Sequence, residues 1–200
     1  MTELQRPVVA IDIDYVLRIP NAKLGQEFRE NVRTAEIVMR AGAVPTVHHS
    51  QPPWDSEGLW RATHSFSGIA VDWILSLLDR GIEVCWASTW VEYANVYFAP
   101  VLGLPTLPLA VVDDGYRDER LSAWKARQIT ELAPGRPLLW VDDAILRSDA
   151  EYVSSHRAGG DPELTRYHRV RDRSVGFTRS DRRECDEWLS GLPSRPPGAG

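Results

Sequence analysis

Short apolar runs alternate along this chain with stretches that are apolar on one side only. Residues Val8 to Ile11 are apolar at every position, which is typical of a central strand buried on both faces of a parallel sheet. Similar runs at 82–87, 107–112 and 137–141 predict three more strands. Because helices are predicted between the strands, the pattern indicates an α/β fold with a mainly parallel central sheet.

Helices are predicted where apolar residues recur at helical spacing. The strongest such segment begins at Ser67 and runs to Asp79 with a broad apolar face, and Gly81 follows it as a helix-ending residue. The remaining helices are expected at 25–40, 92–101, 122–132 and 181–189. These helices would cover the two faces of the sheet and complete a three-layer, Rossmann-like arrangement.

Other regions have weaker patterns. Residues 43–48 are expected to form another strand, and 49–63 an irregular loop because Pro and Gly interrupt it. Beyond Ala144 the apolar pattern weakens. We therefore expect one domain over residues 1–190, in which 17–67 is partly a small cap or an irregular insertion, and a disordered, Pro- and Gly-rich tail at 191–200.

Composition narrows the class of protein. The chain has 200 residues, of which 43% are hydrophobic, enough for one sizeable core, and its net charge of -5 provides no overall basic field for nucleic acid. Arginines crowd the last third of the chain, but acidic residues interleave with them, which favours a solvated surface over a basic groove. With two cysteines, no secretory leader and no apolar run long enough to span a bilayer, we expect a cytoplasmic protein that does not bind membranes.

Polar residues directly follow three of the predicted strands. In a parallel sheet with right-handed crossovers, the carboxyl ends of the strands lie at one edge, and ligands bind there. The residues concerned are Asp12 and Asp14, Ser88 and Thr89, and Asp142 and Asp143. Although they are far apart in sequence, we expect their side chains to meet at that edge.

These residue types suit phosphoryl transfer, which needs a nucleophile, a proton donor, a cation and donors for the phosphate oxygens. Asp12 is the candidate nucleophile and Asp14 the candidate general acid and base. Ser88, or alternatively Thr89, offers a hydroxyl to a phosphate oxygen. Lys125, on the helix predicted at 122–132, offers a fixed positive charge.

The cation in this scheme is Mg²⁺, which prefers hard oxygen ligands such as carboxylates. Asp142 and Asp143 are the candidates to hold it. Asp113 and Asp114 form a competing acidic pair, but Gly115 follows them and favours a turn. A phospho-receiver domain uses similar residues in a different order, with the lysine last, so the order here argues against that class.

The four motifs in this order resemble those of the haloacid dehalogenase (HAD) superfamily. They read Asp12-Ile13-Asp14, Ser88-Thr89, Trp124-Lys125 and Asp142-Asp143, and the resemblance spans roughly residues 7 to 145. The segment Trp86-Ala87-Ser88-Thr89-Trp90, with Ala99-Pro100 and Gly103-Leu104-Pro105, is similar to small HAD proteins related to the "Swiss army knife" RNA-repair HAD domain.

The resemblance implies a HAD-like fold with a minimal cap and an aspartyl-phosphate intermediate on Asp12. It implies Mg²⁺ bound by Asp12, by the backbone carbonyl of Asp14, and by Asp142, with Asp143 beside them. The family usually has Gly after the second aspartate, and this chain has Tyr15. Tyr15 either changes the local turn or projects into the pocket and restricts the substrate.

The function expected from these observations is a Mg²⁺-dependent phosphatase. Thr89, Tyr15 and Trp90 are candidate substrate-binding residues, with Trp90 best placed to stack a base or line the entrance. The substrate is expected to be a phosphomonoester, with a nucleotide or a polynucleotide end as the suggested class. The alternatives are a small-metabolite HAD phosphatase and a catalytically weak HAD-like binding module. The sequence leaves the oligomeric state open.

Overall fold

A four-stranded parallel sheet forms the centre of the molecule. The computed structural model describes residues 6–19, 31–45, 54–115, 120–157 and 162–192. The strand order is β5-β1-β6-β7, and all neighbours are parallel. The strands are β1 (Val8–Ile11), β5 (Glu83–Trp86), β6 (Leu138–Asp142) and β7 (Thr165–Arg169).

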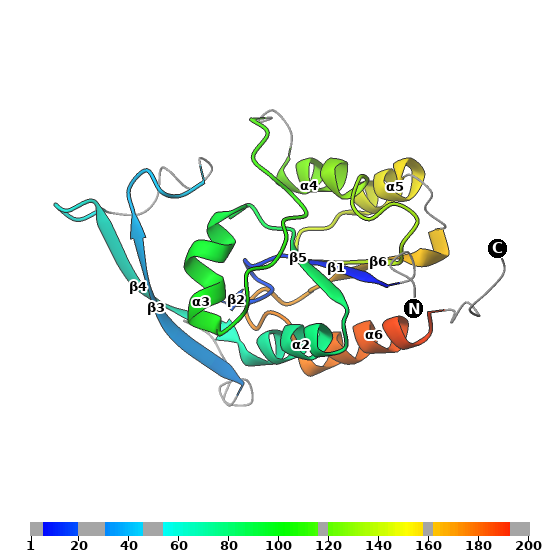
Figure 1. The fold of residues 1–200 in the computed structure, drawn as a ribbon, viewed down its shortest axis with the longest axis horizontal. Coiled ribbons are helices and arrows are strands. Elements are labelled where there is room, and N and C mark those ends of the chain that lie inside the picture. Colours follow the sequence, from blue (N-terminus) through cyan, green and yellow to red (C-terminus); the bar gives the residue numbers. More distant parts are fainter. Residues whose placement is uncertain (1–5, 20–30, 46–53, 116–119, 158–161, 193–200) are drawn as a thin grey trace.

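Helices cover both faces of this sheet (Figure 1). On one face lie α4 (Leu121–Ile129) and α5 (Arg147–His156), and on the other lie α2 (Gly68–Asp79) and α6 (Arg179–Ser190). Val8 and Ala10 of β1 belong to the apolar cluster on the α4 and α5 side. Val9 and Ile11 belong to the cluster on the other side. The strand is apolar at every position because both of its faces are buried.

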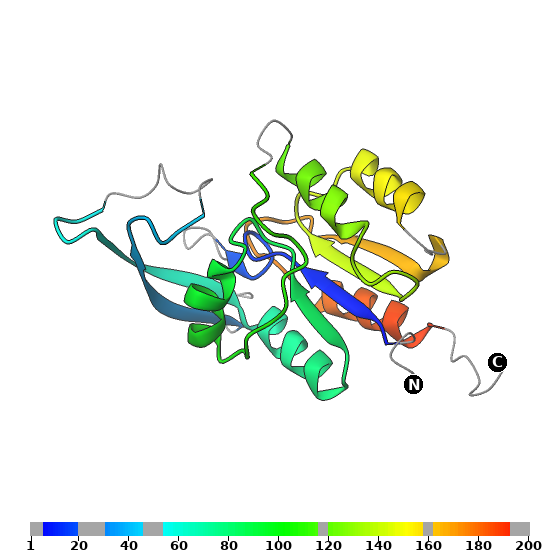
Figure 2. The same cartoon turned by 45° about the horizontal axis from the view of Figure 1, so that its top comes forward.

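A second, antiparallel sheet extends beyond the carboxyl ends of the parallel strands (Figures 1 and 2). Its order is β2-β4-β3, formed by β2 (Arg18–Ile19), β4 (Leu59–Ser67) and β3 (Val32–Arg40). Ile37, Met39 and Phe66 on its inner face are buried in the same cluster as Phe98. That face packs against a π-helical turn, η3 (Ala94–Phe98), and the short helix α3 (Ala99–Leu102).

The antiparallel sheet joins the parallel core without a connecting loop. β4 ends at Ser67, and α2 begins at the next residue with Ser67 as its N-cap. The Ser67 hydroxyl donates to the carbonyl of Phe177 at 2.6 Å, and its backbone N–H donates to the carbonyl of Leu17 at 2.8 Å. Gly68 is needed at this junction, because a Cβ there would lie 2.7 Å from the carbonyl oxygen of Asn31.

The elements with the strongest apolar patterns are confirmed. The runs at 8–11, 82–87 and 137–141 form β1, β5 and β6. The helices expected at 67–79, 122–132 and 181–189 are α2, α4 and α6. Gly81 follows α2 with a φ of 71°, in the left-handed region expected of a residue beyond a helix end. The fold is therefore α/β with a parallel central sheet, as predicted.

The helix predicted at 25–40 is wrong where the structure describes it. Residues 32–40 form strand β3. Val32, Thr34, Ile37 and Val38 are β-branched, and pairing with β4 buries Ile37 and Met39 on one face while Val38 faces outward. Residues 25–30 lie outside the described part of the chain.

Two further predictions between the sheets need correction. Residues 43–45 form no strand, and 46–48 lie outside the described residues. The loop predicted at 49–63 ends early, because β4 already begins at Leu59. The second error arises because the alternating pattern of a half-exposed strand such as β4 is weaker than the pattern of a buried strand.

The strand predicted at 107–112 is reduced to a single bridge between Leu109 and Trp86. Trp86 donates to the carbonyl of Pro108 and accepts from the N–H of Ala110, each at 2.8 Å. Pro108 has no N–H of its own and cannot continue a ladder. The helix predicted at 92–101 is divided into η3 and α3.

The last third of the chain is more regular than its sequence pattern indicated. It contains α5, the 3-10 turn η4 (Pro162–Leu164) and β7, a strand with polar residues that pairs with β6 and with no other strand of the described residues. Residues 193–200 of the predicted tail lie outside the described part. Among the helices of the described residues, none is long and apolar enough to cross a membrane.

Candidate active site

The carboxyl ends of β5, β1 and β6 bring the predicted residues together. β1 lies between β5 and β6, and Asp12 directly follows it. The backbone N–H of Asp12 donates to the carbonyl of Val141 at 3.0 Å, and the N–H of Ala87 donates to the carbonyl of Ile11 at 2.9 Å. These bonds extend the sheet to its edge and hold Asp12 between Ser88 and Asp142.

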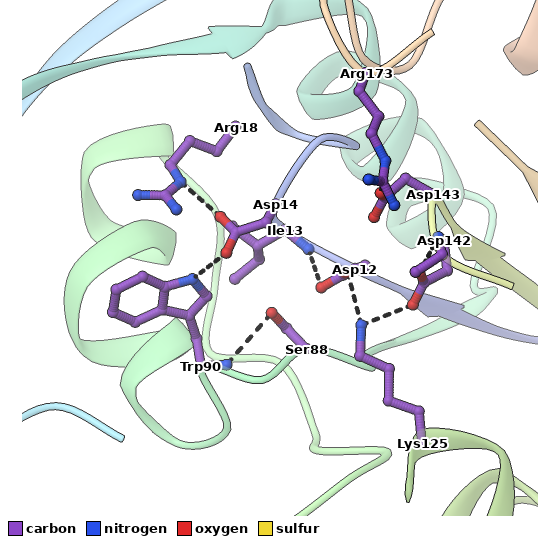
Figure 3. Close-up of polar contacts among 11 residues, drawn as sticks. Asp12, Ile13, Asp14, Arg18, Ser88, Trp90, Lys125, Asp142, Asp143 and Arg173 are labelled. Carbon is purple, nitrogen blue, oxygen red and sulfur yellow. Dashed lines mark hydrogen bonds and ion pairs between the residues drawn. The ribbon is translucent and has the colours of Figure 1, made fainter. Parts of the chain in front are cut away.

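Lys125 reaches this edge from α4. Its Nζ donates to Oδ2 of Asp12 and to Oδ2 of Asp142, each at 2.7 Å (Figure 3). The three residues are buried, with at most 4% of any of them exposed. Lys125 is therefore a buried cation that links the residues at the ends of β1 and β6.

The buried carboxylates outnumber the lysine. Asp12, Asp142 and Asp143 each offer an oxygen within 4.8 Å of the others. Burial raises the pKa of Asp12 to about 7, with Asp142 adding to the effect and Lys125 opposing it. Burial alone would lower the pKa of Lys125, but Asp12 and Asp142 outweigh it and raise that pKa. Both groups hold their protons more tightly than usual, Asp12 chiefly because it is buried and Lys125 because two carboxylates contact it.

The donor set fits a hard divalent cation. Oδ2 of Asp143 is buried and makes no hydrogen bond within the described residues, although the Nε atom of Arg173 forms an ion pair with it at 2.5 Å. Burial raises the pKa of Asp143, and Asp142 adds to this. Asp12, Asp142 and Asp143 thus offer hard oxygen donors of the kind that Mg²⁺ prefers, and one of these oxygens is paired with Arg173.

Backbone amides fix the orientation of two of these carboxylates. Oδ1 of Asp12 accepts from the N–H of Ile13 at 2.7 Å. Oδ1 of Asp142 accepts from the N–H of Ala144 at 2.8 Å. Each carboxylate therefore has one oxygen on a backbone donor and the other on Lys125. The site is held by the chain itself before any ligand arrives.

Asp14 does not join the buried group. Its Oδ1 accepts from Nε of Arg18 at 2.6 Å, and its Oδ2 accepts from the indole Nε1 of Trp90 at 3.1 Å (Figure 3). Its side chain is 20% exposed. The carboxylates of Asp12, Asp142 and Asp143 are grouped, whereas that of Asp14 lies apart from them. The predicted metal ligand of Asp14 is its backbone carbonyl, and that stays a prediction.

Tyr15 keeps the turn that glycine would provide. Its φ is 60°, in the left-handed region, and its N–H donates to the carbonyl of Arg18 at 2.7 Å. The turn brings Arg18 back beside Asp14. The Tyr15 ring is 42% exposed and lies under the guanidinium of Arg173, at 5.4 Å from the ring centre.

The second motif also contains a strained turn. Ser88 is fully buried, and its hydroxyl accepts from the N–H of Trp90 at 3.4 Å. Figure 3 shows this hydroxyl on the same side of the site as the Asp12 carboxylate. Val91 closes the turn with a φ of 44°, which is unusual for a β-branched residue. Thr89 is partly exposed and remains a predicted substrate ligand.

Trp90 was predicted to stack on a base or to line the entrance, and its burial does not favour stacking. It is only 4% exposed, with Phe98 against its ring at 4.9 Å and the Arg18 guanidinium over it at 5.4 Å. A base could reach the ring only after Arg18 moved. The polar edge of the indole is instead directed at Asp14.

Sequence reasoning missed the two arginines that contact the site carboxylates. Arg18 lies four residues after Asp14, and this spacing was the only signal for their pairing. Nothing in the sequence distinguished Arg173 from the other arginines near it. The competing acidic pair lies elsewhere, as predicted: Gly115 donates to Asp113 in a turn, and Asp114 pairs with Arg127 at 2.6 Å.

Comparisons with protein-family models, with curated proteins and with solved structures give no match for this chain. The interpretation of the site therefore depends on its own geometry and chemistry.

Proposed function

We propose that this protein is a Mg²⁺-dependent phosphomonoesterase of the HAD type that forms an aspartyl-phosphate on Asp12. The observation that carries the proposal is the buried bridge from Lys125 to Asp12 and Asp142 at the carboxyl edge of the sheet. Asp143 completes a carboxylate group suited to Mg²⁺. In this proposal the three-stranded antiparallel sheet is the small cap.

The residues divide the chemistry in a simple way. An oxygen of Asp12 attacks phosphorus, and the bond from phosphorus to the leaving oxygen breaks while Asp14 gives that oxygen a proton. Asp14 then takes a proton from the water that hydrolyses the aspartyl-phosphate. Ser88 donates its hydroxyl to a phosphate oxygen, and Lys125 keeps Asp12 in place. Bound Mg²⁺ would neutralise phosphate charge, so that an anionic nucleophile can approach.

The geometry at Tyr15 favours an enzyme over a blocked binding module. The residue adopts the left-handed conformation that glycine would supply, so the turn carrying Asp14 is kept. Its ring is exposed and lies against Arg173. Tyr15 is therefore a rim residue that can select among substrates, and its side chain is not inserted between Asp12 and Lys125.

Phosphate release from p-nitrophenyl phosphate tests the proposal. The wild type should turn over only with Mg²⁺, and Asp12→Asn should lose activity. Asp113→Asn is the matched control, because it removes an aspartate in a turn outside the site. Mg²⁺ should also raise the melting temperature of the wild type but not of Asp143→Asn. No release from any member of a phosphomonoester panel would refute the proposal.

The substrate class needs a separate comparison. A small cap leaves the site accessible, which favours a large substrate such as a polynucleotide end or a nucleotide. Values of kcat/KM for a 3′-phosphorylated oligonucleotide and for mononucleotides would decide between them. Low activity on both, with high activity on small phosphorylated metabolites, would favour the alternative of a metabolite phosphatase.

A further inference from the structure

Asp14 is held by two donors that differ in kind. The Trp90 indole approaches Oδ2 from the turn after β5, and the Arg18 guanidinium approaches Oδ1 from β2. Arg18 also lies over the Trp90 ring at 5.4 Å, so the three side chains form one contact group. We refer to Asp14, Arg18 and Trp90 as the Asp14 clamp.

The two donors have different freedom to move. Trp90 is 4% exposed and packed against Phe98, so its N–H has a fixed direction. The Arg18 side chain is 25% exposed, and only its Nε atom is bonded to Asp14. Trp90 is therefore the rigid half of the clamp, and Arg18 is the half that can exchange partners.

The two oxygens of Asp14 are held in different ways. An indole N–H can only donate, and a carboxyl oxygen without a proton can accept its bond whether the other oxygen is protonated or not. A carboxyl oxygen that gains a proton keeps some acceptor capacity, so the Arg18 bond to Oδ1 would weaken there without being excluded. Because Trp90 is buried and Arg18 is partly exposed, we take Oδ2 as the anchored oxygen and Oδ1 as the oxygen that a ligand can reach once Arg18 moves.

We propose that Trp90 is a positioning residue, whose indole N–H aims Asp14 at the leaving group, while Arg18 covers the oxygen that exchanges the proton. This inference rests on the proposed phosphatase function and specifies how its acid and base is directed. In the first step the Oδ1–H bond breaks and the proton goes to the leaving oxygen as its bond to phosphorus breaks. In the second step Oδ1 takes a proton from water.

Dependence on the leaving group tests this role, because a good leaving group departs without protonation and a poor one does not. The probes are 2,4-dinitrophenyl phosphate, p-nitrophenyl phosphate, phenyl phosphate and an alkyl phosphate, each with saturating Mg²⁺. For Trp90→Phe we expect little change in kcat/KM, which reports the first step, for the dinitrophenyl ester and a loss of about 10-fold or more for the alkyl ester. Asp14→Asn should show the same trend more strongly.

Trp86→Phe is the matched control. Trp86 is a fully buried indole whose Nε1 donates to Asn95 at 2.9 Å, outside the Asp14 clamp. Its loss should lower stability without steepening the dependence on the leaving group. Arg18→Gln should leave that dependence closer to the wild type than Trp90→Phe does, since the anchor on Oδ2 remains.

Three results separate the possibilities. An equal loss of kcat/KM on all four esters in Trp90→Phe, or the same profile in Trp86→Phe, would overturn the positioning role alone. A wild type that hydrolyses none of the esters would overturn the proposed function, and this inference with it. If Trp90→Phe does not fold, β-(3-benzothienyl)-alanine at position 90 keeps the ring and removes only the N–H, so its leaving-group profile decides.

Discussion

Asp12 and Asp14 lie two residues apart, yet their surroundings have little in common. Asp12 is buried beside two other aspartates, and its cationic partner is the equally buried Lys125. Asp14 is partly exposed and lies between an arginine and an indole N–H. The turn at Tyr15 separates the two environments. One motif thus supplies both a carboxylate for the buried site and a carboxylate that is partly open to solvent.

The first prediction tests whether the two ion pairs differ in their contribution to stability. Lys125→Met removes the buried cation from a group of aspartates and should lower the free energy of unfolding by about 3–5 kcal/mol. Arg18→Met, on the Asp14 side, should cost at most about 1 kcal/mol, because both partners are partly exposed. Urea unfolding in EDTA measures both. Equal losses would show that the two environments are energetically alike.

The second prediction concerns the turn between the two aspartates. A left-handed φ is disfavoured by about 1 kcal/mol for a residue with a Cβ, and glycine lacks that penalty. Tyr15→Gly should therefore be about 1 kcal/mol more stable than Tyr15→Ala, because both variants lose the ring but only alanine has a Cβ at the strained φ. Urea unfolding of the two variants measures the difference. Indistinguishable variants would mean that the turn relaxes when the ring is lost.

The third prediction is a pH dependence on the Asp14 side. Burial, with the nearby charge of Arg18, lowers the pKa of His64 from 6.5 to about 4, and Asp14 opposes this. Between pH 6.5 and about 4 the unfolded chain therefore binds a proton at His64 that the folded chain does not bind, so the free energy of unfolding falls as the pH falls through this range. In urea unfolding at pH 6.5 and at about pH 4, His64→Gln should lose less free energy of unfolding than the wild type. Parallel losses in both proteins would exclude His64 as the source.

The core of the site was predictable because strong signals converge there. The apolar runs before Asp12, Ser88 and Asp142 identify buried parallel strands. Because the carboxyl ends of parallel strands lie at one edge of the sheet, the polar residues that follow these strands are expected to meet there. Lys125 was predictable only through the order of the motifs. Its burial and its bridge between Asp12 and Asp142 are properties of the packed fold.

The remaining features carried no comparable signal. Strands β3 and β4 bury only one face, and their alternating pattern was partly mistaken for a helix and a loop. The polar strand β7 was missed because it lies at the edge of the sheet. The ion pair of Arg173 with Asp143 joins segments that are distant in sequence, and the role of Trp90 depends on the direction of a single N–H.

The loopless junction at Ser67 and Gly68 has a mechanical consequence. With no linker residues between β4 and α2, and with Ser67 bonded to Leu17 and Phe177, this connection provides no hinge. The antiparallel sheet therefore behaves as a fixed wall and not as a swinging lid. Entry to the site then depends on the rotation of side chains such as Arg18 and Arg173, which is fast compared with domain closure. For the proposed phosphatase, substrate capture would then need no slow opening step.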